Sequence, residues 1–371
     1  MESANIVIIG GGIVGLAVAS EISKNNDSVY VFEKNKMIGE ETSSHNSGVI
    51  HSGIHYPKGT LKAILSVRGN SMIYEMCDRY HIPYKRLGKL TVASDEREIV
   101  ELEKLMKNGY DNGIAGMKML DSDGIKKMEP AVRSERALYT PSTGIVEPYD
   151  LMNHFHADIL KNGAAVALDT EVTGIKNVDG SYIIQGISGG ESFSIKCNTV
   201  INCAGLYSDK IAEIAGFDID RLGYRLRYVK GDYFRVSGNP PVRMLVYPVP
   251  SGPGLGIHLT PDLSGSVRLG PNAYYVNNIN YRIESRSDDF IKSVSSFLPS
   301  ISEYSISEDS SGIRPQLKKP EGSFKDFIIR DEADNGMPGF INLIGIESPG
   351  LTASPAIAEY VSEIYQNEIK G

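Results

Sequence analysis

The sequence has few cysteines, no excess of basic charge and no long apolar run, and each shortage excludes a class of protein. Its 371 residues include only Cys77, Cys197 and Cys203, none of them in CxxC spacing. A disulfide framework is therefore excluded, and a reducing intracellular compartment is expected. The chain has 46 acidic and 38 basic residues, a formal net charge of −8. Because no basic face is available to neutralise phosphates, a nucleic-acid partner is not expected.

No apolar run reaches the roughly 18 residues that a transmembrane helix requires. The N-terminal apolar stretch lacks a basic segment and follows closely after Glu2, so it does not resemble a signal peptide. These absences predict a soluble, cytoplasmic protein, with contact at a membrane surface left open. A length of 371 residues is too great for one comfortable hydrophobic core and predicts about two domains.

The first part of the chain has the pattern of a βαβ unit. Residues 5–9 form a continuous apolar run bounded by a glycine turn, which is typical of a strand buried on both faces. Residues 13–22 have helical spacing of small and branched side chains, and residues 28–32 form a second apolar run. A strand, a glycine turn, a helix and a strand within about 30 residues predict two parallel neighbouring strands.

The turn after the first strand matches the dinucleotide fingerprint GxGxxG. In this motif Gly10 permits the tight turn, Gly12 allows close approach to a pyrophosphate, and Gly15 lets the helix pack close to the sheet. The phosphates would then lie at the positive N-terminus of the helix. Glu33 follows the second strand and predicts a carboxylate that holds the ribose hydroxyls and repels a 2′-phosphate, so NADP is not expected. The motif comprises Gly10, Gly11, Gly12, Ile13, Val14 and Gly15.

Segments along almost the whole chain resemble FAD-dependent L-2-hydroxyglutarate dehydrogenases. The longest is residues 42–56, Thr-Ser-Ser-His-Asn-Ser-Gly-Val-Ile-His-Ser-Gly-Ile-His-Tyr. The resemblance is specific at the level of the D-amino-acid oxidase-like flavoprotein superfamily and implies FAD as the cofactor. The other segments, in matching order, are residues 66–69, 88–93, 143–146, 202–209, 247–250, 256–260 and 269–273.

One segment departs from this resemblance. Residues 345–354, Gly-Ile-Glu-Ser-Pro-Gly-Leu-Thr-Ala-Ser, resemble the related soluble glycerol-3-phosphate oxidases more closely than the hydroxyglutarate enzymes. The implied cofactor is the same in both groups, but the substrate assignment is divided between them.

Strand patterns of parallel-sheet character occur at the start, middle and end of the chain, with antiparallel patterns between them. We therefore expect an α/β protein in which a Rossmann-type FAD-binding domain is interleaved with an antiparallel-sheet substrate domain. The expected FAD-binding domain comprises residues 1–80, 145–215 and 325–371, and the substrate domain comprises residues 81–144 and 216–324. Predicted helices span residues 61–80, 96–108, 148–161, 288–297 and 355–365, and predicted strands or hairpins span residues 89–93, 164–175, 182–197, 199–203 and 340–344, with an antiparallel sheet in residues 224–270.

The resemblance implies several cofactor contacts beyond the fingerprint. Gly345 and the residues that open the last helix would present N–H groups to the flavin C2 carbonyl, where the reduced flavin gathers negative charge. Val172 matches the strand position that pairs with the adenine edge, and Ala204 and Gly205 match the turn beside the ribityl-phosphate. The remaining predicted cofactor residues are Lys34, Thr42, Ser43, Ser44, His45, Asn46, Ser47, Gly48, Gly350, Leu351 and Thr352.

Arg314 is the first candidate to bind a substrate carboxylate, because its guanidinium fork matches a planar anion bidentately. The alternative is a surface ion pair. His258 and Tyr247 lie in segments that resemble the hydroxyglutarate enzymes, and we expect both at the substrate site. Lys230 is a candidate for a second anion contact.

His45, His51 and His55 fall within eleven residues, but no carboxylate or cysteine shares their spacing, so no metal is expected. His51 is the predicted catalytic base because an ordinary histidine is mostly neutral at pH 7. A purely structural role is the alternative, and His55 is the rival base and a candidate substrate contact. By resemblance to the glycerol-phosphate enzymes, Ser348 would orient the substrate.

The leading functional hypothesis is hydride removal from a small L-2-hydroxy acid, with L-2-hydroxyglutarate as the first substrate to test. Glycerol 3-phosphate is the second candidate, oxidation of an amine is the third, and a flavin-binding subunit without turnover is the alternative that is not an enzyme. The electron acceptor, whether oxygen, a quinone or a carrier protein, is not indicated. Some dimethylglycine dehydrogenase relatives attach flavin covalently through a histidine at the spacing of His45 from Gly48, and this linkage stays open.

Overall fold

The structure is a computed structural model that describes residues 2–238, 240–250, 256–320 and 322–370. The chain divides into two compact units, each built from separate stretches of sequence. The first unit comprises Met1–Ser44, Pro148–Tyr228 and Arg314–Gly371, and the second comprises His45–Glu147 and Val229–Ile313. The differences from the predicted domains are residues 45–80 and 145–147, which belong to the second unit, and residues 216–228 and 314–324, which belong to the first.

The first unit contains a sheet with the strand order β10-β11-β12-β1-β2-β9. Strands β12, β1, β2 and the edge strand β9 are parallel to one another, which confirms the βαβ pattern of the sequence. The last three residues of β12 pair with β20 in parallel, and β20 pairs with β19 in antiparallel orientation. The strands are β1 (Glu2–Ile9), β2 (Val29–Phe32), β9 (Ala165–Ala167), β10 (Thr170–Val178), β11 (Ser181–Ser188), β12 (Glu191–Asn202), β19 (Ile328–Glu332) and β20 (Met337–Ile344).

The sequence predicted a hairpin over residues 182–197 and a separate buried strand over residues 199–203. This separation is wrong, because the second strand of the hairpin and the buried strand are one continuous strand, β12. Its first half pairs with β11 and its second half with β20, while β1 runs along its other edge. The change of partner, from a peripheral hairpin to the buried parallel sheet, explains why the sequence pattern changes in the middle of the strand.

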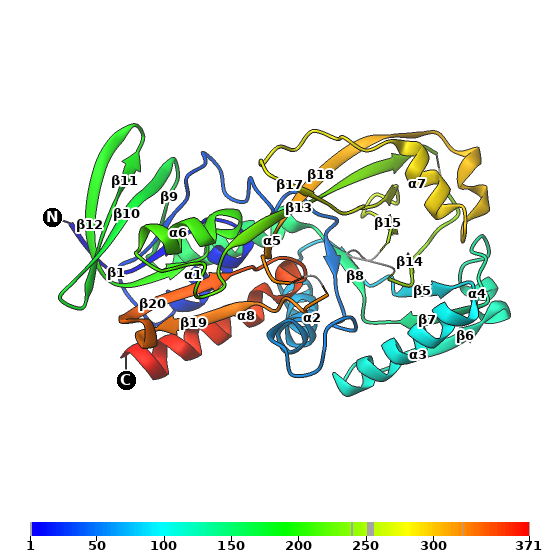
Figure 1. The fold of residues 1–371 in the computed structure, drawn as a ribbon, viewed down its shortest axis with the longest axis horizontal. Helices are drawn as coiled ribbons and strands as arrows, with labels where there is room; N and C mark the ends of the chain where they lie inside the picture. Colours follow the sequence, from blue (N-terminus) through cyan, green and yellow to red (C-terminus); the bar gives the residue numbers. More distant parts are fainter. Residues whose placement is uncertain (1, 239, 251–255, 321, 371) are drawn as a thin grey trace. The chain divides into compact units, whose positions relative to one another are not determined.

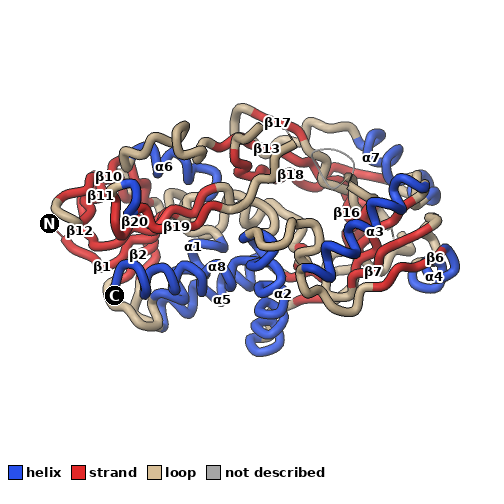
Figure 2. Tube along the Cα trace, turned by 60° about the horizontal axis from the view of Figure 1, so that its bottom comes forward, coloured by secondary structure: helices blue, strands red, loops and turns tan. Residues whose placement is uncertain are grey.

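Helices cover this sheet, as the tube in Figure 2 shows for α1, α5 and α8, which gather on one side of the strands. α1 contacts both α5 and α8, whereas α6 contacts β10, β12 and β20. The helices are α1 (Ile13–Ile22), α5 (Pro148–Lys161), α6 (Ser208–Ile214) and α8 (Gly350–Ile364), with short turns at Gly205–Tyr207 and Ala333–Asn335 and a π-helical end at Tyr365–Lys370.

The last helix begins earlier than predicted. Pro355 was expected at the helix start, but α8 begins at Gly350 and contains the proline inside it. A proline has no N–H to donate to the carbonyl four residues before it. In α8 this carbonyl belongs to Leu351, and it accepts a hydrogen bond from Ser354 Oγ at 2.9 Å instead. The neighbouring serine therefore allows the helix to pass through the proline.

The second unit is built on a mostly antiparallel sheet with the order β17-β13-β16-β15-β14-β5-β7-β6, and β18 also pairs with β13. β14 and β5 are parallel, in contrast to the antiparallel pairs β5–β7, β6–β7, β14–β15, β15–β16 and β13–β16. The strands are β5 (Lys89–Ala93), β6 (Lys118–Asp121), β7 (Arg136–Thr140), β13 (Leu226–Val236), β14 (Leu245–Pro248), β15 (Leu259–Pro261), β16 (Val267–Leu269), β17 (Tyr274–Val276) and β18 (Ile306–Leu317).

Helices α3 and α4 pack against the β5–β7 part of this sheet, as the cyan ribbons in Figure 1 show. A separate three-stranded sheet has the order β3-β8-β4. The remaining elements are α2 (Leu61–Tyr80), α3 (Glu96–Asp111), α4 (Ser122–Met128), α7 (Ser287–Val294), the short turn Pro299–Glu303, β3 (Val49–Ile50), β4 (Tyr84–Lys85) and β8 (Gly144–Val146). The predicted helix at residues 61–80 and the predicted strand at residues 89–93 are confirmed to the residue.

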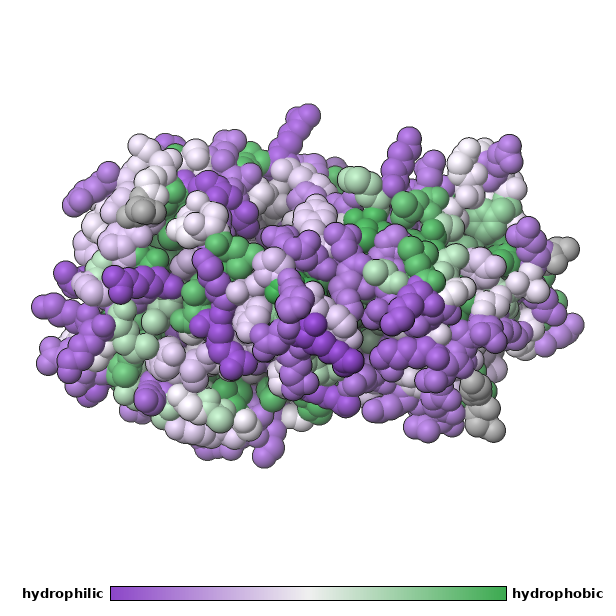
Figure 3. Space-filling view, turned by 180° about the vertical axis from the view of Figure 1, so that it is seen from behind, coloured by the Kyte–Doolittle hydropathy of each residue, from purple (hydrophilic) through white to green (hydrophobic). Residues whose placement is uncertain are grey.

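The outer face seen in Figure 3 is largely polar, with groups of apolar side chains between the charged ones. Large exposed apolar side chains lie on several elements, including Ile64 on α2, Val100 on α3, Leu160 on α5 and Ile187 on β11. Within the described ranges, none of the helices combines the length and the apolar character needed to cross a membrane.

Candidate active site and cofactor-binding segments

The glycine fingerprint forms a tight turn between β1 and α1. Gly10 has φ +111°, a conformation that side-chain-bearing residues rarely adopt, and a Cβ there would collide with the carbonyl of Cys203. A Cβ on Gly15 would collide with the carbonyl oxygen of Gly10. The turn therefore needs glycine at both positions, as the dinucleotide motif requires.

Glu33 lies at the end of β2 with 7% of its surface exposed. Its Oε2 accepts a hydrogen bond from Gly11 N at 2.7 Å, and its Oε1 accepts one from Asn35 N at 2.8 Å. Burial raises the pKa of this carboxyl, while the two backbone donors and the adjacent Lys34 oppose that change. Glu33 is thus a buried acceptor placed beside the glycine turn, the position from which a carboxylate binds a ribose diol.

In the helices predicted to face phosphate and flavin, the N-cap residue itself provides no side-chain cap, although Ser43 Oγ accepts a hydrogen bond from Ile13 N at the start of α1. α1 begins after Gly12, and α8 begins after Pro349, neither of which caps its helix through a side chain. Thr60, Asp95 and Asp121, by contrast, cap α2, α3 and α4. α6 and α7 also lack a side-chain cap from their N-cap residues, so this feature is not specific to α1 and α8. The positive potential of any helix start suits a phosphate or an electron-rich carbonyl.

Residues near the α1 turn already contact it. Ser43 Oγ accepts a hydrogen bond from Ile13 N at 2.9 Å, and Ser44 Oγ donates one to Glu41 O at 3.2 Å. Lys34 forms an ion pair with Glu41 at 2.7 Å. Thr42 belongs to the same turn. These predicted residues lie in the first unit, as does the fingerprint with Gly12 and Val14.

The other predicted cofactor residues of the first unit lie at strand ends and helix starts. Val172 is buried in β10, opposite Gly186 of β11. Ala204 N donates to Asn202 Oδ1 at 3.3 Å just after β12, and the space beside Gly205 is open. The loop from β20 to α8 is tight, since Gly350 N donates to the carbonyl of Glu347 at 2.7 Å. This loop carries Gly345 and Ser348, and Leu351 and Thr352 follow in the first turn of α8.

The segment of residues 45–48 lies in the second unit. The His45 ring stacks on Tyr281, with ring centroids 3.9 Å apart and an interplanar angle of 21°. Asn46 Oδ1 accepts a hydrogen bond from Gly48 N at 2.8 Å, which closes a turn around Ser47. These contacts hold the segment within its own unit, and its cofactor role stays a prediction.

A basic cluster lies in the second unit, formed by His51, His55, Lys89 and His258. Lys89 is 1% exposed, and its Nζ lies 3.0 Å from His55 Nε2. The ammonium also lies 4.9 Å from the ring centroid of Tyr247, and this ring stacks on His258 at 3.6 Å. His51 and His55 are half-buried, whereas Lys89, Tyr247 and His258 are buried.

The electrostatics of the basic cluster favour its neutral forms. Burial lowers the pKa of Lys89 to about 7. Burial, followed by the charge of Lys89, lowers the pKa of His51 to about 3. The pKa of His55 is also well below its ordinary value, because of burial first and then of Lys89, His51 and His258. His51 is therefore neutral at physiological pH and available as a proton acceptor.

Three asparagine side chains hold the loop that carries His51 and His55. Gly53 has φ +89°, and a Cβ there would lie 2.7 Å from Val67 of α2. The loop is therefore pressed against α2, and side-chain amides bind its carbonyl groups. Asn70 donates to the carbonyl of His51 at 2.9 Å, Asn108 to those of Ile54 at 2.7 Å and Tyr56 at 2.9 Å, and Asn112 to those of Gly53 at 3.2 Å and Tyr56 at 2.9 Å.

A cavity of about 310 Å³ adjoins this loop within the second unit. His55 forms part of its wall, so that one face of the basic cluster reaches open space. The lining residues are His55, Pro57, Glu101, Lys104, Leu105, Asn108, Val249 and Pro250.

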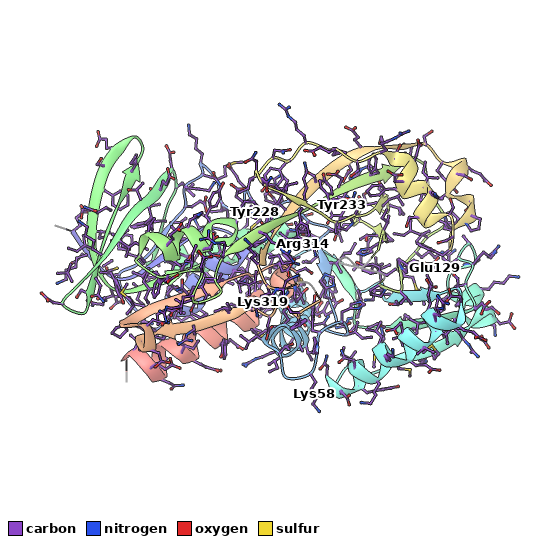
Figure 4. All side chains as sticks on the ribbon, in the orientation of Figure 1. Lys58, Glu129, Tyr228, Tyr233, Arg314 and Lys319 are labelled. Carbon is purple, nitrogen blue, oxygen red and sulfur yellow. The ribbon has the colours of Figure 1, made fainter. Side chains whose placement is uncertain are left out.

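Arg314 belongs to the first unit, on β18 (Figure 4). Its side chain is 30% exposed, and its Nη1 lies 3.9 Å from Glu347 Oε2. This separation is at the long end for an ion pair. The guanidinium thus keeps exposed donors, and its predicted role as a carboxylate ligand stays a prediction.

Lys230, on β13, is fully buried and its three N–H groups are directed to protein acceptors. Nζ donates to Asn280 Oδ1 at 3.1 Å, to the carbonyl of Arg282, and to Glu284 Oε1 at 3.2 Å. An anion contact, as predicted from sequence, would require one of these bonds to be exchanged. The structure shows Lys230 as an anchor for the loop of residues 280–284.

The structure brings together four of the predicted residues, His51, His55, Tyr247 and His258, around a lysine that the sequence reasoning did not select. Lys89 opens a strand, Lys-Leu-Thr-Val-Ala, in which every residue is buried. A charged residue at the end of an otherwise apolar strand was the available signal. Arg314 and Ser348 belong to the other unit. Within the described ranges, no three histidine, cysteine or acidic side chains are grouped to hold a metal ion.

Comparison with known proteins gives one family for nearly the whole chain. Residues 5–364 match the family described as "DAO: FAD dependent oxidoreductase". The chain is 35% identical over 402 residues to "L-2-hydroxyglutarate dehydrogenase, mitochondrial" of Arabidopsis thaliana, with 97% of this chain and 83% of the relative covered. It is 32% identical over 373 residues to "Glycerol 3-phosphate dehydrogenase" of Caloramator mitchellensis, with 99% and 74% covered.

Among solved structures, the fold is similar to dithionite-reduced L-alpha-glycerophosphate oxidase from Mycoplasma pneumoniae with FAD bound. The TM-score is 0.88 at 29% identity, covering 99% of this chain and 95% of the other. Glycine oxidase from Geobacillus kaustophilus has the same fold, with a TM-score of 0.80 at 20% identity over 99% of this chain and 96% of the other.

Proposed function

Because this chain belongs to the DAO family of FAD-dependent oxidoreductases, we propose that it oxidises the CH–OH group of a small L-2-hydroxy acid to the 2-oxo acid. The predictions of an α/β flavoprotein fold, of FAD and of an enzyme acting on CH–OH are confirmed by the family match and by the relatives. The glycine turn and the buried Glu33 fit a dinucleotide cofactor.

The observation that carries the proposal is the basic cluster with neutral His51 at its edge. Oxidation of a secondary alcohol removes a hydride from carbon and a proton from oxygen. FAD, when bound, supplies the acceptor for the hydride. His51, held in place by the amide of Asn70 on its carbonyl, accepts the hydroxyl proton through an imidazole nitrogen.

The basic cluster also explains how His51 becomes a sufficient base. In the free protein its pKa is about 3, which makes it a weak proton acceptor. A substrate carboxylate that enters the cluster stabilises a positive imidazolium and raises this pKa. Binding of the anion and acceptance of the proton are therefore coupled, and a substrate without a negative charge gains less from His51.

We propose L-2-hydroxyglutarate as the substrate, and glycerol 3-phosphate as the second candidate. The first is supported by the names of the hydroxyglutarate relatives from plants and animals. The second is supported by the Caloramator relative, by the Mycoplasma structure and by residues 345–354. Both molecules are small anions with an oxidisable secondary alcohol, which the basic cluster suits. Oxidation of an amine, as in glycine oxidases, is the third candidate.

The remaining site assignments are proposals of the same kind. Arg314 would bind the carboxylate next to the reacting carbon, using its exposed guanidinium donors. Ser348 would orient the substrate from the loop before α8. Tyr247 and His258, stacked on each other beside Lys89, would shape the substrate site.

Rapid anaerobic mixing tests the function directly. The purified FAD-loaded protein is mixed with L-2-hydroxyglutarate, D-2-hydroxyglutarate, glycerol 3-phosphate or glycine, and loss of the oxidised flavin absorbance is followed. We expect L-2-hydroxyglutarate to reduce the flavin fastest and its D-enantiomer to be slow. If only glycerol 3-phosphate or glycine reduces the flavin, the substrate proposal is wrong.

We propose a cytoplasmic location, supported by three free, buried cysteines that suit a reducing compartment. The relatives from Arabidopsis thaliana and Homo sapiens carry mitochondrial names, so fractionation of the source cells is the deciding measurement. The electron acceptor, among oxygen, a quinone and a carrier protein, is identified by adding each to the reduced protein.

A further inference from the structure

Lys89 is a fully buried lysine that has no counter-ion among the described residues. Within the described ranges its polar contacts are the His55 nitrogen at 3.0 Å and the face of the Tyr247 ring, and it forms no ion pair. A buried ammonium is strongly unfavourable unless an anion or several acceptors compensate it. The other buried lysine at a predicted site, Lys230, has three oxygen acceptors. The contrast indicates that Lys89 needs an anionic partner that the described part of the chain does not provide.

We propose that Lys89 and His55 together bind the anionic group of the substrate that is remote from the reacting carbon. This inference rests on the proposed function and names the residues that select a substrate with such a group. For a 2-hydroxydicarboxylate the group is the second carboxylate, and for glycerol 3-phosphate it is the phosphate.

The chemistry of the pair fits two oxygen acceptors. When Lys89 donates one N–H to His55 Nε2, the histidine carries its own proton on Nδ1. The pair then retains N–H donors on Nζ and a donor on Nδ1 for the incoming oxygens. His55 is half-buried and borders open space, whereas Lys89 is buried behind it. An anion in the cavity can therefore contact His55, and Lys89 Nζ lies 3.0 Å from His55 Nε2. Once Lys89 is protonated, the low dielectric of this site strengthens its attraction for the anion.

Among the described residues, no carboxylate contacts Lys89. The adjoining cavity contains one, Glu101, whose charge is paired with Lys104 at 2.7 Å. The titratable groups that act on the pair are His51 and His258, and Tyr247 lies against Lys89. Tyr247 is itself near Tyr233 and Tyr56, and burial raises its pKa (Tyr233 is labelled in Figure 4). Every one of these groups is neutral or positive at physiological pH, so the cluster as a whole attracts an anion.

The first experiment compares substrates that differ only in the remote group. L-2-hydroxyglutarate and L-2-hydroxyvalerate have the same carbon chain, with a carboxylate or a methyl group at the far end. Their kcat/KM values are measured for wild type, for Lys89→Met, which keeps the aliphatic stem, and for Lys118→Met, a control at an exposed lysine of the same unit.

We expect Lys89→Met to lower kcat/KM for L-2-hydroxyglutarate by about 10- to 100-fold, the effect of a lost charged hydrogen bond. Most of this loss should appear in KM, and kcat/KM for L-2-hydroxyvalerate should change by less than about threefold. The control should resemble wild type with both substrates. Equal losses with both substrates in Lys89→Met would overturn the proposal, because they would place Lys89 in the chemistry or in structure alone. Glycerol 3-phosphate and glycerol form the corresponding pair for a phosphate.

A second experiment does not depend on turnover and separates this inference from the proposed function. Glutarate, valerate and inorganic phosphate are titrated into the FAD-loaded protein at pH 8 by calorimetry in two buffers of different ionisation enthalpy. Lys89, with a pKa of about 7, is mostly neutral at pH 8 and must take up a proton when it pairs with an anion.

Wild type should therefore take up close to one proton when it binds glutarate or phosphate. The ligand that binds more tightly identifies the anionic group that the pair prefers. Lys89→Met should lose this uptake, and valerate should cause little in either protein. Binding of glutarate with proton uptake, but without oxidation of any hydroxy acid, would support the anion site and contradict the proposed reaction. Equal binding of glutarate and valerate would overturn the anion site itself.

Discussion

Replacement of Lys89 by methionine should make the protein more stable, and the gain should depend on pH. Methionine keeps the apolar stem of the side chain and removes the buried ammonium. The pKa of Lys89 falls from an ordinary value of 10.5 to about 7 in the folded protein because of burial. The folded state therefore binds the proton less tightly than the unfolded state, and folding in the protonated form is penalised.

The size and sign of this effect follow from the two pKa values. One pH unit corresponds to about 1.4 kcal/mol, so the difference between 10.5 and 7 corresponds to a penalty of at most about 5 kcal/mol. The full penalty applies below pH 7, where both states are protonated, and it disappears as the pH rises toward 10.5. At pH 10 only about 1 kcal/mol remains. Loss of the contact with His55 opposes the gain by about 1 kcal/mol.

Urea denaturation of the FAD-loaded wild type and Lys89→Met, at equal free FAD, measures the difference between pH 6 and pH 10. We expect the variant to be more stable by about 3–4 kcal/mol at pH 6 and about equal to wild type at pH 10. Lys118→Met, at an exposed lysine, should show a difference that does not change with pH. A Lys89→Met variant that is less stable at pH 6, or whose advantage is constant across the range, would refute the reasoning.

Four further predictions concern single residues. His51→Ala with full flavin content should be reduced by substrate about 10²–10⁴-fold more slowly, and reduction within a few-fold of wild type in stopped-flow would exclude His51 as the base. Gly15→Ala should be purified without yellow flavin colour, because its Cβ would collide with Gly10 O; an absorbance spectrum of fully loaded protein would contradict this. Acid precipitation should leave all the flavin in the supernatant, whereas yellow colour in the pellet would mean covalent attachment at His45. Lys230→Met should lower the free energy of unfolding by about 2 kcal/mol, because its hydrogen bonds are lost, and its KM should stay within a few-fold of wild type. A large rise in KM at unchanged stability would instead support the predicted contact between Lys230 and the substrate.

Much of the first unit could be predicted from sequence because its signals are local. The fingerprint needs glycine for steric reasons that involve residues a few positions away, as the collision between Gly15 and Gly10 shows. Buried parallel strands such as β1 and β2 appear as unbroken apolar runs. α8 was predicted too short because Ser354, and not a regular backbone bond, satisfies the carbonyl that Pro355 leaves.

The strands of the second unit were harder to predict, because much of their pairing is between distant residues. β18, Ile-Ser-Glu-Asp-Ser-Ser-Gly-Ile-Arg-Pro-Gln-Leu, is mostly polar over its first half and has no strand pattern there. It is a strand because β13 pairs with it. The parallel pairing of β14 with β5 likewise joins residues that are about 150 positions apart in the sequence, and local patterns carry no information about such a partner.

Only part of the candidate site was predicted, because some of its properties depend on residues that are distant in the sequence. His51 and His55 were selected from a local segment, and Tyr247 and His258 from resemblance. Lys89 was not selected, because a lysine beside an apolar strand is usually read as a solvated residue at the strand end. Its chemical character depends on burial and on the fact that, among the described residues, no carboxylate contacts it. Both properties exist only in the folded unit.

The free energy cost of burying protonated Lys89 affects both the stability of the protein and its affinity for an anionic substrate. Around an exposed lysine, such as Lys118, water and salt screen the attraction for an anion. Burial removes that screening, so the folded protein is penalised when no anion is present. The arriving anion recovers the same interaction, because it replaces the lost water around the ammonium and draws the proton back. A side chain that destabilises the free protein by several kcal/mol can therefore contribute a comparable part of the affinity for a substrate with a remote anionic group.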